Sequence, residues 1–203
     1  MGGRQGAAGP LPSLSEPFLD TRPDPREALL AAVRSHAASR PDQADAAGRF
    51  AAFIAANPDC CERSLPEGHL TGSAWLVSRD GLRVLLTHHR KLGKWLQLGG
   101  HADGDHDLAR VALREAEEES GLRDLEVEPA IFDLDCHWIP PGKSDPGHYH
   151  WDMRYVVRAS GDETFTVSDE SHALAWREIA ELVDEPDLDE SVRRMAAQWM
   201  QRL

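Results

Sequence analysis

The sequence predicts an α+β protein, an α/β/α sandwich built on a mixed β-sheet and preceded by an N-terminal helical hairpin. Three observations lead to this class. Strand patterns lie before and after one strongly helical stretch at 108–120, two helical runs stand ahead of the first strand, and an amphipathic helix follows the last strand. We expect three parts, namely a flexible N-terminal arm at 1–22, a helical extension at 23–66 and the main domain at 67–203.

The N-terminal arm is rich in Gly, Pro, Ser and Ala and has no periodicity, which is typical of a loosely packed segment. Helical patterns follow at 26–33 and 44–56. The second run carries Phe50, Phe53 and Ile54 on one face and ends before a proline. We expect the two helices to cover the main domain or to build the contact of a homodimer.

The main domain is predicted to consist mostly of short strands, because apolar and β-branched residues alternate along it. The first two strands form a hairpin around the turn Arg79-Asp80-Gly81. The predicted strands lie at 70–77, 83–89, 96–98, 125–127, 131–139, 148–159, 164–167 and 173–176, and the helices that follow lie at 178–183 and 189–202.

The composition limits the classes of function. The 203 residues carry a formal net charge of −13, which disfavours nucleic acids and anionic membranes as partners because both repel an acidic surface. No apolar run approaches the length of a membrane span, and the first residues lack the apolar core of a signal peptide. Cys60, Cys61 and Cys136 have neither a disulfide framework nor metal-ligand spacing. We therefore expect a cytoplasmic protein that acts on a small molecule.

One stretch, residues 99–122, concentrates the chemistry. Its helix brings Glu115, Glu118 and Glu119 to one face at spacings i, i+3 and i+4, where like charges repel. Crowded carboxylates suit a divalent cation, and Mg²⁺ and Mn²⁺ prefer such oxygen ligands. The neighbouring Arg114 can fix the orientation of one carboxylate. The order of strand, glycine turn and helix also favours phosphate binding, because a helix N-terminus attracts anions.

This stretch resembles the signature of Nudix hydrolases, which reads Gly, five residues, Glu, seven residues, then Arg-Glu-apolar-x-Glu-Glu-x-Gly-apolar. Here Gly100 is followed at the same spacings by His106 and by the run Arg114-Glu115-Ala116-Glu117-Glu118-Glu119-Ser120-Gly121-Leu122. Every fixed position matches except the first Glu, which is His106. Several fixed residues at fixed offsets make the signal specific. The resemblance covers about residues 70–183 and implies the Nudix fold.

The resemblance implies a metal-dependent hydrolase that cleaves the pyrophosphate linkage of a nucleoside diphosphate derivative by water attack at phosphorus. Its substrate class stays open among nucleotide sugars, ADP-ribose-like compounds, dinucleotides and nucleoside triphosphates. By match to the motif, Glu118, Glu119 and the Gly99 carbonyl would bind Mg²⁺ or Mn²⁺. Glu115, oriented by Arg114, would be a further ligand or the general base.

Two points around this site have alternatives. Some Nudix enzymes take the general base from a downstream loop, which makes Glu170, and after it Asp169, a catalytic candidate. His106 has three interpretations. It can be read as a metal ligand, which would suit Mn²⁺ or Zn²⁺ better than Mg²⁺, or as an exposed histidine near the start of the helix. In the third interpretation, a neighbouring acid takes the role of the family's glutamate, and the candidates are Asp103, Asp105 and Asp107.

Substrate contacts are expected from basic and polar residues near the glycine turn and on the strand at 148–159. The segment before the turn is basic in an otherwise acidic chain, so it suits a substrate phosphate, although a solvated loop has the same composition; its members are His88, His89, Arg90, Lys91 and Lys94. His148, His150 and Asp152 share a strand face and, with His137, predict a second metal site, a pocket lining or a solvated strand face. We assign substrate binding to His89, Arg90, Lys94, Gln97, His101, His150 and Arg154.

Two other functions compete with hydrolysis. A Nudix-fold binding module without turnover would explain His106, but such a protein is expected to lose Glu118 or Glu119 first. An enzyme like isopentenyl-diphosphate isomerase shares the fold and needs a pocket cysteine, for which Cys136 is available. The nearly intact set of glutamates favours hydrolysis over both.

Overall fold

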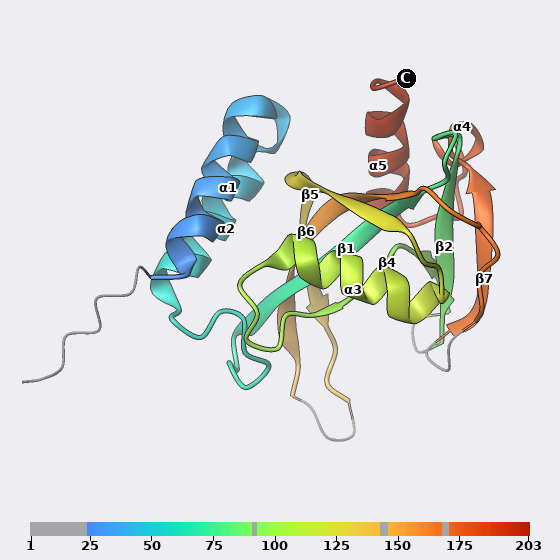
Figure 1. Cartoon of the computed structure of the whole chain (residues 1–203). Helices are drawn as coiled ribbons and strands as arrows, with labels where there is room; N and C mark the ends of the chain where they lie inside the picture. Colours follow the sequence, from blue (N-terminus) through green and yellow to red (C-terminus); the bar gives the residue numbers. More distant parts are fainter. Residues whose placement is uncertain (1–23, 91–92, 143–145, 168–170) are drawn as a thin grey trace, which may run out of the picture.

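The computed structural model describes residues 24–90, 93–142, 146–167 and 171–203. Its helical elements are α1 (Arg26–Ser39), the 3₁₀ turn η1 (Pro41–Gln43), α2 (Ala44–Ala56), α3 (Leu108–Ser120), α4 (Ile179–Leu182) and α5 (Glu190–Met200). Its strands are β1 (Gly68–Val77), β2 (Arg83–His89), β3 (Trp95–Leu96), β4 (Leu98–His101), β5 (Leu125–Ile139), β6 (His148–Ala159) and β7 (Ser171–Glu178) (Figure 1).

The sheet is mixed and is organised around β1. The order is β3-β2-β1-β6-β5, with β4 paired to β1 and β7 paired to β2. Strand β1 runs antiparallel to β2 and β4 and parallel to β6. This pairing places two segments far apart in the chain, β4 and β6, on either side of the same half of β1.

Helices cover both faces of the sheet, so the predicted α/β/α sandwich is confirmed. Alternate residues of β1 point to opposite faces. Leu70 and Leu76 belong to the core that includes α3, whereas Trp75 and Val77 belong to a second core under α4 and α5. Figure 1 shows α3 lying across the sheet and α5 rising from its other side.

The predicted N-terminal helical hairpin is present and packs onto the sheet at β5 and β6. The Phe53 ring stacks on Trp151 of β6 at a centroid distance of 4.4 Å. Side chains from α1, η1 and α5 also bond to the backbone of β5. The His36 Nδ1–H donates to the Ile131 carbonyl (3.0 Å), the Leu134 N–H donates to Gln43 Oε1 (3.2 Å), and Gln198 Nε2 donates to the Phe132 carbonyl (2.7 Å). The hairpin thus covers the main domain, one of its two expected roles.

Three sequence-based strand assignments need correction. Residues 164–167 form no strand, since Thr166 instead donates its N–H to the Ser120 carbonyl at the end of α3 (2.7 Å). The runs at 125–127 and 131–139 are one strand, β5, whose register shifts between Val127 and Asp133. The run at 96–98 is interrupted at Gln97, which separates β3 from β4.

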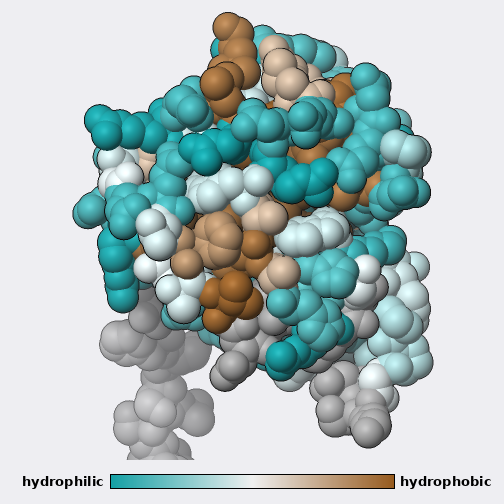
Figure 2. Space-filling view, turned by 90° about the vertical axis from the view of Figure 1, so that its right-hand side faces the viewer, coloured by the Kyte–Doolittle hydropathy of each residue, from teal (hydrophilic) through white to brown (hydrophobic). Residues whose placement is uncertain are grey.

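One face of the described surface can be judged from its hydropathy (Figure 2). The face on the β2–β7 side is mostly hydrophilic, with a group of hydrophobic residues near its middle (Figure 2). Among the described residues, none of the helices has both the length and the apolar character needed to cross a membrane.

Candidate functional site

The glutamates of α3 converge on the glycine turn of β4. Glu119 is only 8% exposed, and its Oε1 accepts a hydrogen bond from the Gly99 N–H (2.8 Å). The Glu115 carboxylate lies against Gly100, where an added Cβ would sit 2.3 Å from Glu115 Oε2. Glu118 is exposed. The spacing read from the sequence therefore brings two carboxylates to the turn and leaves the third open to solvent.

Arg114 orients Glu115 in the way its position in the sequence suggests. Its Nη2 donates to Glu115 Oε1 (2.9 Å) and to the backbone carbonyl of His101 (3.2 Å). Because one guanidinium nitrogen spans a helix carboxylate and a strand carbonyl, α3 and β4 are fixed relative to one another at the turn.

The segment between β4 and α3 carries the acids that were candidates to replace the missing glutamate. Each of them has a partner. Asp103 pairs with Arg63, Asp105 with Arg110 (2.7 Å), and Asp107 caps the helix by accepting from the Arg110 N–H (3.1 Å).

His106 lies beside two buried cysteines that the sequence did not connect with it. A nitrogen of its ring and the Sγ atoms of Cys60 and Cys61 all lie within 4.8 Å of one another, and its Nδ1–H donates to the Gly104 carbonyl (3.2 Å). Cys60 and Cys61 follow α2, so His106 joins the start of α3 to the N-terminal extension. Of the interpretations given above, half-burial in this contact argues against a simply exposed histidine.

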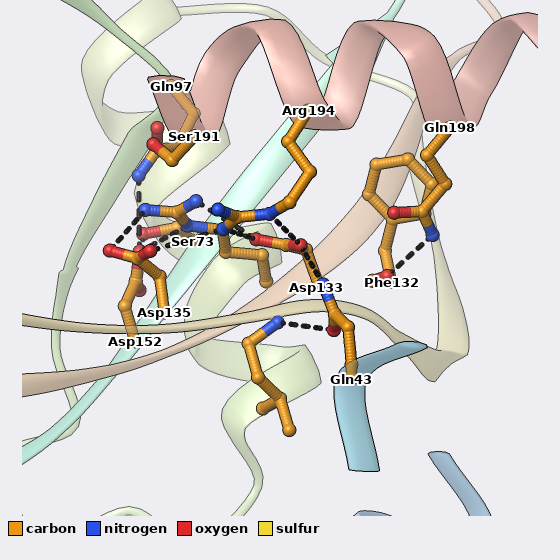
Figure 3. A network of polar contacts seen from close by, with 12 residues as sticks. Gln43, Ser73, Gln97, Phe132, Asp133, Asp135, Asp152, Ser191, Arg194 and Gln198 are labelled. Carbon is orange, nitrogen blue, oxygen red and sulfur yellow. Dashed lines mark hydrogen bonds and ion pairs between the residues drawn. The ribbon is translucent and has the colours of Figure 1, made fainter. Parts of the chain in front are cut away.

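Two residues assigned to substrate binding, Gln97 and Arg154, share one buried partner, Asp152. Thr71 and Ser73 donate to Asp152 Oδ1 (2.9 and 2.7 Å), while Gln97 Nε2 and Arg154 Nε donate to Oδ2 (3.1 and 2.7 Å). The network gathers beneath α5 (Figure 3). Asp152 thereby accepts hydrogen bonds from donors on two strands, β1 and β6, and at the β3–β4 junction.

Arg154 is 2% exposed and is held by three carboxylates. Besides Asp152, its guanidinium contacts Asp133 (3.0 Å) and Asp135 (3.3 Å). Arg194 of α5 pairs with the same two acids from the solvent side (2.8 and 3.1 Å). Such a network compensates the cost of burying the charges.

The pKa of Asp135 reflects this balance. Burial raises the pKa of the carboxyl, but a hydrogen bond with His137 and the positive charges of Arg154 and Arg194 lower it by more. The net result is a pKa well below the ordinary range for aspartate, so the carboxylate stays ionised.

The basic segment lies at the end of β2 and the start of β3. His89 is the last residue of β2 and Arg90 follows it, while Lys94 Nζ pairs with Asp189, the residue that caps α5 (3.2 Å). The ring of His88 packs near Trp95 and His172 (5.2 and 5.7 Å). Lys91, Asp169 and the candidate base Glu170 lie outside the described residues.

Histidines form a cluster next to the glycine turn, but its membership differs from the predicted set. The ring centroids of His69, His101 and His150 are 5.0 Å apart in each pair. The sequence had singled out His137, His148, His150 and Asp152. His137 and His148 flank the cluster, whereas Asp152 joins the arginine network. His69 was not among the residues that the sequence singled out.

Burial lowers the pKa of two histidines of this cluster. It lowers the pKa of His150 to about 2 and that of His69 to about 4, and the neighbouring imidazoles, His101 first among them, add to both shifts. Both rings are therefore neutral at pH 7, the state in which imidazole nitrogens bind metals.

Cys136 is the residue that an isomerase-like reaction would need. It is on β5 and packs against the core shared with α1 and α2. Burial raises the pKa of its thiol, which disfavours the reactive thiolate.

Comparison with known proteins identifies relatives of this chain. A family model described as NUDIX domain matches residues 69–200. A NUDIX-family hydrolase from Clostridium perfringens is 27% identical, with a TM-score of 0.50, over 66% of this chain and 97% of that one. Two further structures match with a TM-score of 0.51 and 0.52, an Ap4A hydrolase from C. elegans and a dihydroneopterin triphosphate pyrophosphohydrolase from E. coli; each is 14% identical over 66% of this chain and 96% of that one. No curated protein matches significantly.

Proposed function

The chain belongs to the NUDIX family and is a pyrophosphohydrolase, and from this premise we propose a specific reaction. The enzyme cleaves the pyrophosphate linkage of a nucleoside diphosphate derivative by water attack at phosphorus, with Mg²⁺ or Mn²⁺ bound at the α3 glutamates. The observation that carries the proposal is the convergence of Glu115 and Glu119 on the Gly99–Gly100 turn.

The residues at this turn fit a hard divalent cation. They supply carboxylate oxygens and the Gly99 carbonyl, which Mg²⁺ and Mn²⁺ prefer over nitrogen or sulfur. The space beside Gly100, which a Cβ would fill, is occupied by the Glu115 carboxylate. In the proposal, Glu115, Glu118 and Glu119 hold the ion together with the Gly99 carbonyl. A divalent ion bound there would neutralise phosphate charge and lower the pKa of a water molecule.

The other proposed roles, positioning and proton transfer, belong to side chains of this protein. Arg114 is a positioning residue, since it fixes Glu115 through a 2.9 Å hydrogen bond. Glu115 is a further ligand or the general base, Glu118 is a ligand exposed on α3, and Glu170 is the candidate base from the downstream loop. Positioning and charge neutralisation carry most of the rate in phosphoryl transfer, so few groups need to react themselves.

Substrate contacts are proposed for the residues near the turn and at the end of β2. His89, Arg90 and Lys94 would neutralise outer phosphates, and His101 and His150 would line the approach. Gln97 and Arg154 would act through Asp152, because both donate to its carboxylate. Nucleotide sugars, ADP-ribose-like compounds, dinucleotides and nucleoside triphosphates are the substrate classes to test.

The experiment is a hydrolysis panel over these classes with Mg²⁺ and Mn²⁺ separately. We expect one class to turn over, and we expect Glu118→Gln and Glu119→Gln to lose about a thousandfold in rate, since each removes a metal-binding charge. Gln at 119 still offers an oxygen to the Gly99 N–H, so the fold is kept. Glu117→Gln, between fixed positions of the motif, is the matched control and should keep its rate.

If the panel gives no turnover while nucleotides bind tightly, the protein is a binding module instead. Equal rates for Glu117→Gln and Glu119→Gln would contradict the assignment of the carboxylates. We also propose that the chain divides at 22/23 and 66/67 and that the protein is cytoplasmic. We further propose a homodimer formed through the N-terminal helices, which light scattering of the full chain would test.

A further inference from the structure

Three histidines from three strands meet on one side of the glycine turn. His69 of β1 is the register partner of His150 in the parallel β1–β6 pair. His101 of β4 lies opposite Thr71, two residues along β1 from His69 and therefore on the same face. The pairing of the sheet, rather than proximity in the chain, builds this group.

The geometry of the group is compatible with a metal site. One ring nitrogen from each of His69, His101 and His150 lies within 4.8 Å of the other two. Tetrahedral zinc bonds to histidine of about 2.0–2.1 Å place the nitrogens about 3.4 Å apart, so small side-chain rotations close the site. The rings are held on strands, which limits the entropy lost when an ion is bound.

His69 supplies an independent observation that points to a ligand. It is 2% exposed, yet neither of its ring nitrogens has a hydrogen-bond partner among the described residues. Leaving buried polar groups unpaired is costly, and about nine in ten such groups in proteins have a partner. His150 Nε2 is likewise buried without a partner in the described part of the chain. A bound cation would satisfy these nitrogens.

His148 is placed as a fourth donor. Its ring lies 4.9 Å from that of His69 and 5.1 Å from that of His150. Its Nδ1–H donates to the Pro146 carbonyl (2.8 Å), while Nε2 is buried and has no partner among the described residues. Histidines that bind metals through one nitrogen commonly donate from the other to a carbonyl in this way.

We propose that His69, His101 and His150 bind a divalent transition-metal ion of the zinc type, with His148 able to complete the coordination. Imidazole nitrogens suit Zn²⁺ and similar ions and suit Mg²⁺ poorly. The site is therefore chemically distinct from the glutamates of α3, although His101 follows Gly99 by two residues. This inference stands whether or not the hydrolase proposal holds.

The test uses the full chain carrying Glu118→Gln and Glu119→Gln, so that the carboxylate site is weakened. After removal of bound metals with a chelator, Zn²⁺ is titrated by calorimetry and Co²⁺ by absorption spectroscopy at pH 7. We expect one Zn²⁺ per chain and the visible bands of tetrahedral Co²⁺ without the near-ultraviolet thiolate band that cysteine ligands give. His69→Gln, His101→Gln and His150→Gln should each weaken the affinity at least tenfold.

His172→Gln, an exposed histidine outside the cluster, is the matched control and should leave the affinity unchanged. If His69→Gln fails to fold, the half-buried His101 still gives the answer. The proposal is overturned if the histidine variants bind as tightly as the control or if the starting protein binds no Zn²⁺. It is also overturned if the Co²⁺ spectrum shows thiolate ligation that persists in His101→Gln, because the ion would then lie at Cys60 and Cys61.

Discussion

The Glu115 carboxylate occupies the space that a side chain at Gly100 would need, with Oε2 2.3 Å from the position of an added Cβ. Close approach of the helix to the strand is thus possible only because residue 100 has no side chain. The glycine of the motif therefore leaves room for the carboxylate of the glutamate that follows it fifteen positions later.

This contact predicts the effect of Gly100→Ala. The methyl group would push the Glu115 carboxylate away from the turn and from Arg114, so we expect turnover to fall at least tenfold with a modest loss of stability. The measurement is the rate at saturating Mg²⁺ beside a thermal melt. Gly142→Ala, where an added Cβ meets open space, is the control and should behave as wild type. An unchanged rate in Gly100→Ala would remove Glu115 from the metal site.

Arg154 is predicted to act on stability before it acts on substrate. In Arg154→Met the buried acids Asp133 and Asp152 lose their shared cation, and breaking a buried ion pair costs about 3–5 kcal/mol. Urea denaturation measures the loss. Arg194→Met, at the solvent side of the same network, should cost less. If Arg154→Met were as stable as wild type and raised only KM, Arg154 would contact the substrate directly.

The low pKa of Asp135 predicts part of the response to acid. Because this carboxyl binds its proton more weakly in the folded state than in the unfolded chain, its contribution to stability is complete above about pH 3.9 and is lost as pH falls below that value. We expect Asp135→Asn to have a shallower decline of unfolding free energy below pH 4 than wild type. Parallel declines would show that other carboxyls carry the acid response.

His106 predicts the outcome of restoring the family's glutamate. In His106→Glu a carboxylate would replace the ring beside Cys60 and Cys61, which are 0% and 1% exposed, and burying a charge without a partner is unfavourable. We expect a melting temperature several degrees lower than in wild type, with His106→Gln intermediate. A variant that melts higher than wild type would show that the imidazole has no structural role there.

The sequence predicted those features that depend on local spacing. The run from Arg114 to Glu119 fixed the helix and its carboxylates, because residues three and four apart share a helix face whatever surrounds them. The same holds for β6, whose bounds agree with the predicted 148–159, because alternation is a local property.

Features set by strand register and by competing bonds were not visible. His69 meets His150 only because β1 and β6 pair in parallel, and Cys61 meets His106 only after the chain has folded. The alternation of residues at 164–167 resembled that of a strand, but the Thr166 N–H donates a hydrogen bond to the Ser120 carbonyl at the end of α3. Arg154 was assigned to substrate binding, and its burial among three acids from neighbouring strand positions depends on the pairing of β5 with β6.

The side chains that bond to the backbone of β5 have a consequence for self-association. β5 ends the strand order, and the free edge of a sheet is a template on which another chain can add a strand. His36, Gln43 and Gln198 engage backbone groups of Ile131, Leu134 and Phe132 on that strand. An added strand would have to displace them there. The N-terminal extension thereby protects the enzyme against edge-to-edge aggregation, and a dimer formed by continuing the sheet through this segment is disfavoured.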